Sequence, residues 1–157
     1  MRLFLGIHYL EIGGVETSLI NLLLALDPQR VEVDLLVYDP RGEMMEFIPS
    51  WVKQIEAPKA YRYIERSLKE TLLAGEWRMV WTRLRAKWAM QQYSKQQQPK
   101  DGSAIFGYIG QYVTPILPSL ANLGHYDLAI SYLTPHNIVL KKVDASKKVA
   151  WIHTDYS

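Results

Sequence analysis

The amino-terminal segment constrains the fold most, because strand-like and helix-like patterns alternate there around a pair of glycines. Residues 2–9 are almost continuously apolar, which is typical of a parallel strand covered on both faces. Gly13-Gly14 follows, and leucines then recur at helical spacing over residues 16–26. Residues 32–38 form the next expected strand, with apolar Val33, Leu35, Leu36 and Val37, so the order is strand, glycine turn, helix, strand. The first strand should therefore lie in the middle of a parallel α/β sheet.

The rest of the chain continues this alternation with shorter patterns. We expect, in order, a short helix over 44–48, a strand over 52–55, helices over 60–74 and 76–97, a helix within 104–123 interrupted at Pro115 and Pro118, a strand over 126–132, a short helix over 136–142 and a strand over 148–153. The predicted fold is α/β, a Rossmann-like three-layer sandwich with a mainly parallel central sheet. Residues 1–157 form one domain, with a basic helical insertion over about 59–123.

Composition excludes several classes of protein. The chain has 157 residues, 48% hydrophobic and 22% charged, which fits one soluble domain, and its formal charge of +2 argues against nucleic acid as the main partner. The absence of cysteine excludes disulfides, a thiolate nucleophile and cysteine-ligated metals. The apolar start is broken by His8 and Glu11, so it fits a buried strand better than a signal peptide. No run of about twenty apolar residues predicts a membrane span, and the cytoplasm is the default location.

Three loops are expected to meet at one edge of the sheet, because ligands of open α/β sheets bind beyond the carboxyl ends of the strands. These loops contain Gly13-Gly14, then Thr134 and His136, then His153 and Asp155. The glycines allow a ligand to approach the backbone, and the following helix offers free N–H groups to a phosphate or a sugar hydroxyl. A plain strand-to-helix connection is the alternative. Neither the dinucleotide-binding fingerprint nor the P-loop pattern is present.

The histidines are candidates for ligand contacts rather than metal ligands. His153 ends the last expected strand, where it can hydrogen-bond a sugar or phosphate, or else only a neighbouring carbonyl group. His136 begins an expected helix. Its side chain either contacts a ligand or is simply solvated. Asp155 shares a side of the extended chain with His153. No third ligand lies at metal-binding spacing and no nucleophile elbow is present, so we expect neither a metal nor another cofactor.

A basic segment with regularly spaced tryptophans stands out in the middle of the chain. Residues 59–100 contain ten Lys and Arg against three Glu, a local charge of +7. One helical stripe carries Trp77, Trp81 and Trp88, with Arg78 and Arg85 beside it. Interfacial helices use such a pattern to bind anionic lipid headgroups, so the segment is a candidate for contact with a membrane or an acceptor. Packing of the stripe against the sheet or the neighbouring helix, with the cations facing water, is the conservative alternative, and nucleic acid binding is a third.

The two ends of the chain together resemble family-4 (GT4) glycosyltransferases of the GT-B fold. The resemblance lies in the strand followed by Gly13-Gly14-Val15-Glu16-Thr17-Ser18, in the strand Tyr126-Asp127-Leu128-Ala129-Ile130-Ser131, and in Val149-Ala150-Trp151-Ile152-His153-Thr154-Asp155. It extends over all 157 residues, but only as the first half of such an enzyme. The chain is therefore similar to the Rossmann-like amino-terminal domain of the family.

The resemblance implies transfer of a sugar from a nucleotide-sugar donor to a glycan or lipid-linked acceptor, with retention of configuration and without a metal, in polysaccharide or cell-envelope biosynthesis. The amino-terminal domain would hold the acceptor, and the protein's own carboxyl-terminal domain the donor. His153 would lie near the transferred sugar as the catalytic residue. The resemblance places Gly13 and Gly14 against donor phosphates or acceptor, and Glu16 also matches the motif. Together with Val15 of the turn and Thr134, His136 and Asp155 of the other loops, they are the candidate substrate-binding residues.

One part of the family pattern is missing, because no two glutamates lie eight positions apart to form the E-x7-E pair of the donor domain. We therefore expect the donor domain to be absent from these residues and the isolated chain to be inactive. The expected location of the enzyme is cytoplasmic or peripheral on the inner face of a membrane. A nucleotide-sugar epimerase of GT-B fold and a non-catalytic α/β interaction module remain as alternatives.

Overall fold

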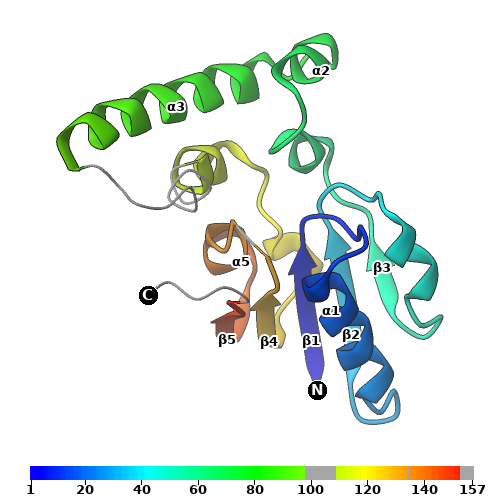
Figure 1. Ribbon diagram of the computed structural model, residues 1–157. Coiled ribbons are helices and arrows are strands. Elements are labelled where there is room, and N and C mark those ends of the chain that lie inside the picture. Colours follow the sequence, from blue (N-terminus) through cyan, green and yellow to red (C-terminus); the bar gives the residue numbers. More distant parts are fainter. Residues whose placement is uncertain (98–108, 134, 153–157) are drawn as a thin grey trace.

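A five-stranded parallel sheet forms the centre of the computed structural model, which describes residues 1–97, 109–133 and 135–152 (Figure 1). The strands are β1 (Arg2–Ile7), β2 (Glu32–Val37), β3 (Lys53–Ile55), β4 (Tyr126–Ser131) and β5 (Ala145–Ala150). Their order is β3-β2-β1-β4-β5, and every neighbouring pair is parallel. This order confirms the α/β class and the central position of the first strand. The order reverses between β1 and β4, next to the end of the strand that precedes the glycine turn.

One face of the sheet is covered by α1 (Gly14–Ala25) and by the 3₁₀ helix η1 (Glu43–Phe47). Alternate residues of β1, such as Leu5 and Ile7, point to this face because successive side chains of a strand alternate. They pack against Leu19 and Leu23 of α1, which are completely buried. The apolar side of α1 therefore fixes the helix, and the turn that precedes it, against the central strand.

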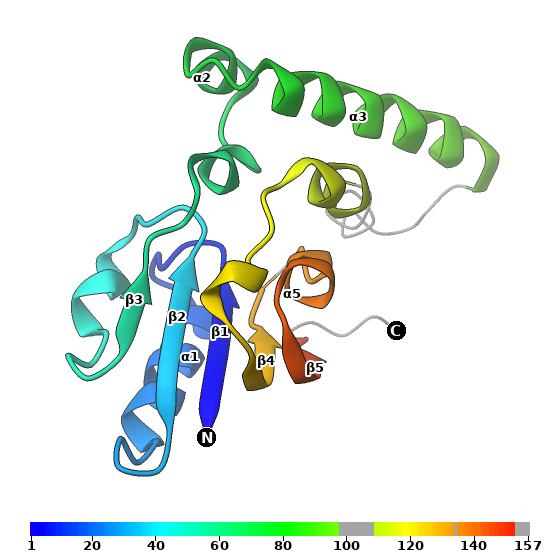
Figure 2. The same cartoon turned by 180° about the vertical axis from the view of Figure 1, so that it is seen from behind.

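The opposite face carries a second apolar cluster that includes Phe4 of β1 and Tyr38 after β2. The elements packed there are α5 (Asn137–Lys142) and three 3₁₀ helices, η2 (Lys59–Tyr63), η3 (Thr114–Ile116) and η4 (Ala121–Leu123). The fold thus has three layers, as the view from behind shows (Figure 2). Buried Val113 and Leu117 belong to this core, so part of the segment predicted as an insertion over 59–123 completes the domain.

Several element boundaries differ from those predicted. The helix expected over 60–74 is divided into η2 and α2 (Leu68–Leu73), because Ser67 begins a new helix. The Ser67 hydroxyl accepts a hydrogen bond from the Glu70 N–H, and the Glu70 carboxylate accepts one from the Ser67 N–H, which is a capping box. The next helix, α3 (Trp77–Gln97), agrees with the prediction. Of the helix expected within 104–123, the structure describes a helical stretch at 109–113 followed by η3 and η4.

The last strand was predicted three residues too late. It runs from Ala145 to Ala150, and not over 148–153, because Tyr126 of β4 pairs with Ala145. The apolar residues near its end suggested a buried strand, whereas β5 is an exposed edge strand that carries Lys147 and Lys148. Consequently the strand ends three residues before His153.

Candidate functional site

The glycine turn lies at the carboxyl edge of the sheet and begins α1. Gly13 occupies the position before the helix, and the Thr17 N–H and hydroxyl both donate to its carbonyl oxygen. The carboxylate of Glu16 folds back against Gly13 and is buried, so a side chain at position 13 would collide with it. Apart from its chain neighbours and the backbone of its own helix, a Cβ at Gly14 would meet none of the described atoms within 4 Å. The turn therefore has one side closed by Glu16 and one side open at Gly14.

Side chains connect this turn to the ends of β4 and β5. Ser18 on α1 lies 3.2 Å from the Tyr132 hydroxyl, measured between the two oxygens. The Tyr132 ring stacks on Trp151, with 5.2 Å between ring centroids. On the other face, the Nδ1 atom of His136 lies 2.9 Å from the hydroxyl oxygen of Ser131, the last residue of β4. The loops after β1, β4 and β5 thus share one edge of the sheet, as expected for parallel neighbours.

The sequence-predicted site residues have different outcomes. Gly13, Gly14, Glu16 and His136 lie at this edge. Val15 packs against the apolar cluster on the α1 face and presents its side chain to the core. Three predicted residues lie outside the described part of the chain, namely Thr134, His153 and Asp155.

The sequence analysis did not single out a second group of polar residues, which we call the rim cluster. It consists of His8 and Tyr9 after β1, Asp39 and Arg41 after β2, and Glu65 and Arg66 between η2 and α2. Arg66 donates two hydrogen bonds of 3.0 and 2.8 Å to the Asp39 carboxylate, which is buried. The Nε atom of Arg41 lies 3.1 Å from the same carboxylate. The rim cluster therefore joins the segment before α2 to the edge of the sheet.

Burial shifts the pKa values of two residues of the rim cluster, His8 and Glu65. Loss of solvent lowers the pKa of the buried His8 imidazole to about 4, so this ring is neutral at neutral pH. Its Nε2 atom lies 3.6 Å from a Glu65 carboxylate oxygen, which is too long for a hydrogen bond, and neither ring nitrogen has a hydrogen-bond partner among the described residues. Burial also raises the pKa of Glu65, whose side chain is 23% exposed. A partly exposed carboxyl group with a raised pKa is suited to accepting a proton or a hydroxyl hydrogen bond.

Tyr9 links the rim cluster to the glycine turn. Burial raises the pKa of its phenol, and the nearby carboxylates of Glu65, Glu11 and Glu16 raise it further. The Arg41 guanidinium lies over its ring, 5.0 Å from the centroid. Tyr9 is therefore influenced by charged groups of both the rim cluster and the glycine turn.

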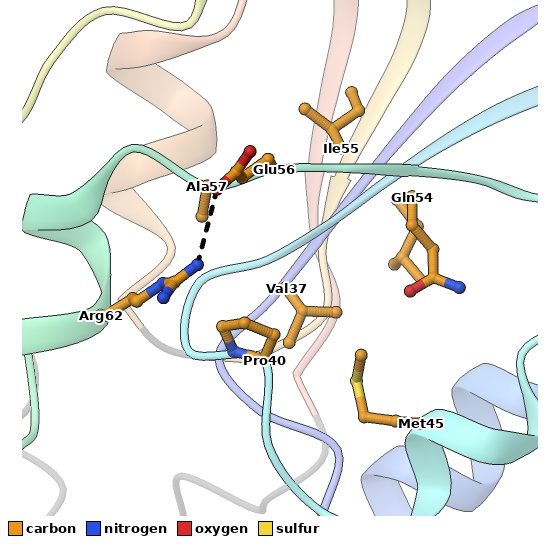
Figure 3. Close-up of a pocket in the computed structure, with 9 residues that line it drawn as sticks. Val37, Pro40, Met45, Gln54, Ile55, Glu56, Ala57 and Arg62 are labelled. Atoms are coloured by element: carbon orange, nitrogen blue, oxygen red, sulfur yellow. Dashed lines mark ion pairs between the residues drawn. The ribbon is translucent and has the colours of Figure 1, made fainter.

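Two hollows lie along this edge. The first, about 430 Å³, is lined by Glu11, Ile12, Arg41, Gly42 and Glu43, and lies between the glycine turn and the loop after β2. The second, about 330 Å³, lies near the ends of β2 and β3, between Met45 and Gln54 on one side and Arg62 on the other (Figure 3). Arg62 pairs there with Glu56, with 3.8 Å between nitrogen and oxygen. The first hollow adjoins the rim cluster through Arg41, so it is the better candidate for a ligand of the site.

The tryptophan stripe does not pack against the sheet. The side chains of Trp77, Trp81 and Trp88 are 61%, 64% and 65% exposed, so the conservative interpretation of the sequence pattern is wrong. Arg78 and Arg85 are exposed as well. The helix buries its opposite side instead, where Met79 joins the core of the domain.

Among the described residues, no three His, Asp or Glu side chains are grouped so as to hold a metal ion. No described helix has the length and apolar character needed to cross a membrane. Comparison with known protein families, with curated proteins and with solved structures finds no significant match.

Proposed function

We propose that the chain is the acceptor-binding half of a retaining glycosyltransferase. The enzyme transfers a sugar from a nucleotide-sugar donor to a glycan or lipid-linked acceptor in polysaccharide or cell-envelope biosynthesis, in the cytoplasm or at the inner membrane face. The observation that carries this proposal is the convergence of Gly13-Gly14, Tyr132 and Trp151 at one edge of the sheet, beside the point where strand order reverses. The motif resemblance supports it, because the same segments carry the family pattern.

The glycine turn is assigned to the acceptor and not to the donor diphosphate. An anion at a helix N-terminus is stabilised by free N–H groups and by the helix dipole. Here the buried Glu16 carboxylate lies against Gly13 and already supplies that negative charge. A second anion would be repelled, whereas a sugar hydroxyl can donate a hydrogen bond to the carboxylate. A neutral hydroxyl group beside Gly14 is therefore the favoured ligand.

In the proposed reaction, the acceptor oxygen forms a bond to the anomeric carbon of the donor sugar. The bond from that carbon to the diphosphate oxygen breaks, and the nucleoside diphosphate leaves with the electron pair. The proton of the acceptor hydroxyl passes to the departing diphosphate. Charge on the departing group must be stabilised in a site closed to water. A donor-binding domain outside these 157 residues would supply that stabilisation, and this chain would orient the acceptor.

The proposal is tested by incubating the complete protein with a panel of nucleotide-sugars and candidate acceptors and identifying the products. A glycoside formed with retained configuration supports it. An epimerised nucleotide-sugar identifies the alternative GT-B epimerase, and the absence of turnover with every donor favours a non-catalytic interaction module. Either result overturns the proposal.

Replacing Gly14 with valine in the complete enzyme is expected to reduce transfer about a hundredfold or more, because the added side chain occupies the space assigned to the acceptor. The fold should persist, since a Cβ at this position meets no described atom within 4 Å apart from its chain neighbours and the backbone of its own helix. Circular dichroism and the rate of product formation measure the two effects. Leu24→Val, at the exposed far end of the same helix, is the control and should leave turnover unchanged. Unchanged turnover in Gly14→Val removes this turn from the site.

Replacing Glu16 with glutamine should raise the KM for the acceptor about tenfold or more, because a hydrogen bond to a charged group contributes about 1.5–3 kcal/mol. The KM for the donor should change little if the turn does not contact the diphosphate. Initial rates with each substrate varied in turn separate the two constants. A donor KM that falls, with the acceptor KM unchanged, would instead assign the turn to the diphosphate.

A further inference from the structure

The helix α3 presents an exposed apolar strip that the proposed sugar transfer does not use. Trp77, Trp81, Leu84 and Trp88 are spaced three or four residues apart, so they share a strip about 60° wide on the helix surface. All four side chains are exposed. Scattered exposed apolar residues are ordinary, but a continuous row of this kind marks an interaction surface.

The strip faces away from the rest of the domain and is held in that orientation. On the opposite side of α3, Met79 and Ala86 are each only 1% exposed. Arg83 on the same side donates hydrogen bonds to the carbonyl oxygens of Tyr63 and Arg66. Both views show α3 lying beyond the carboxyl ends of the strands, at the end of the molecule where the candidate site lies (Figures 1 and 2).

Positive charge flanks the strip on both sides. At 100° per residue, Arg78 and Arg85 lie on one flank and Lys87 lies on the other. All three side chains are exposed, and α3 contains no acidic residue in its sequence. The surface is therefore complementary to a partner that is apolar at the centre and anionic around it.

A small crevice joins the strip to α2. It has a volume of about 230 Å³ and apolar walls that include Leu68 on α2, Leu84 and Met90 on α3, and Ile109. Lys87 lines the same crevice. A hydrocarbon chain with an anionic group near one end fits such a lining, because the chain leaves water and the charge meets the ammonium group.

We propose that the surface formed by α2 and α3 docks on an anionic lipid bilayer. The tryptophans lie at the level of the headgroups, the three cations contact lipid phosphates, and the crevice receives part of one acyl chain. Nucleic acid also binds tryptophan and arginine. The leucine within the strip and the apolar crevice favour lipid, because nucleic acid offers nothing to fill them.

The test uses the purified chain and vesicles of phosphatidylcholine, with and without phosphatidylglycerol, in a flotation assay. Binding is expected only with the anionic vesicles at low salt, with a blue shift of tryptophan fluorescence. It should weaken at an ionic strength of about 1 M, where the Debye length falls to about 3 Å. Replacing Arg78, Arg85 and Lys87 together with glutamine should reduce partitioning about a hundredfold, since each cation contributes about 1 kcal/mol.

The matched variants separate the strip from general hydrophobicity. Trp81→Ser with Trp88→Ser should abolish flotation, whereas Leu24→Ser with Phe47→Ser, which removes exposed apolar groups elsewhere, should not. Circular dichroism checks that both variants remain folded. Retained flotation of the tryptophan variant overturns the proposal. So does strip-dependent self-association without vesicle binding, or a preference for a single-stranded oligonucleotide. The assay contains no sugar donor or acceptor, so its failure leaves the proposed transfer reaction untouched.

Discussion

Replacing Gly42 with alanine is expected to lower the free energy of unfolding by about 3 kcal/mol or more. The backbone at Gly42 has φ 107° and ψ 154°, a region that residues with a side chain rarely adopt. In addition, a Cβ at this position would overlap the carbonyl group of Leu10 and the N–H of Glu11. Backbone strain and overpacking each cost about 1–3 kcal/mol, so together they are large for a domain of this size.

The same substitution should disturb the candidate site, because Leu10 lies between the end of β1 and the glycine turn. The Leu10 N–H donates to the Arg41 carbonyl and the Leu10 carbonyl accepts from the Met44 N–H, each at 2.9 Å. These two bonds hold the segment after β1 against the loop after β2. A side chain at Gly42 would displace that segment, and with it the position of Tyr9.

Gly14→Ala is the matched control, since both substitutions add one methyl group to a glycine near the same edge. Gly14 is the first residue of α1 and has open space around its Cβ position, so alanine should be neutral or slightly stabilising there. Urea denaturation followed by circular dichroism measures both variants. Equal midpoints for Gly42→Ala and the unmodified chain would show that the loop relaxes without cost.

The central strands were predictable because their physical cause is local. Burial of a parallel strand on both faces requires a continuous apolar run, and residues 3–7 and 35–38 have one. The edge strand β5 was misplaced for the same reason, because an exposed edge needs no such run and its lysines resemble a loop. The sequence pattern also did not predict which face of α3 is buried. The exposed face is more aromatic than the buried face, which is the reverse of the usual pattern.

The rim cluster could not be predicted from local patterns, because its contacts join residues far apart in the chain. Asp39 and Arg66 are separated by 27 positions, and His8 and Glu65 are separated by 57. One signal was present. His8 and Asp39 are each the first polar residue after a buried parallel strand, the position at which functional side chains of α/β sheets gather.

Because of His8, the free energy of unfolding should decrease as the pH is lowered from about 6.5 to 4. The buried imidazole has a folded-state pKa of about 4 against an ordinary value of 6.5, so the unfolded chain binds more protons in this interval. The contribution of His8 is complete above pH 6.5 and is lost as the pH falls towards 4. A difference of this size corresponds to about 3 kcal/mol. Urea denaturation at several pH values measures the slope.

His8→Leu isolates this effect, because leucine has a similar volume and does not titrate. At pH 7 the variant should be at least as stable as the unmodified chain, since it removes two buried ring nitrogens without hydrogen-bond partners in the part of the chain that the structure describes. Glu65 acts in the opposite direction: its raised pKa adds stability at low pH that is lost as the pH rises through the folded-state value. That contribution is present in both proteins, so the difference between them reports His8. Parallel pH curves for the two proteins would mean that the folded chain admits a charged imidazole at position 8 without cost.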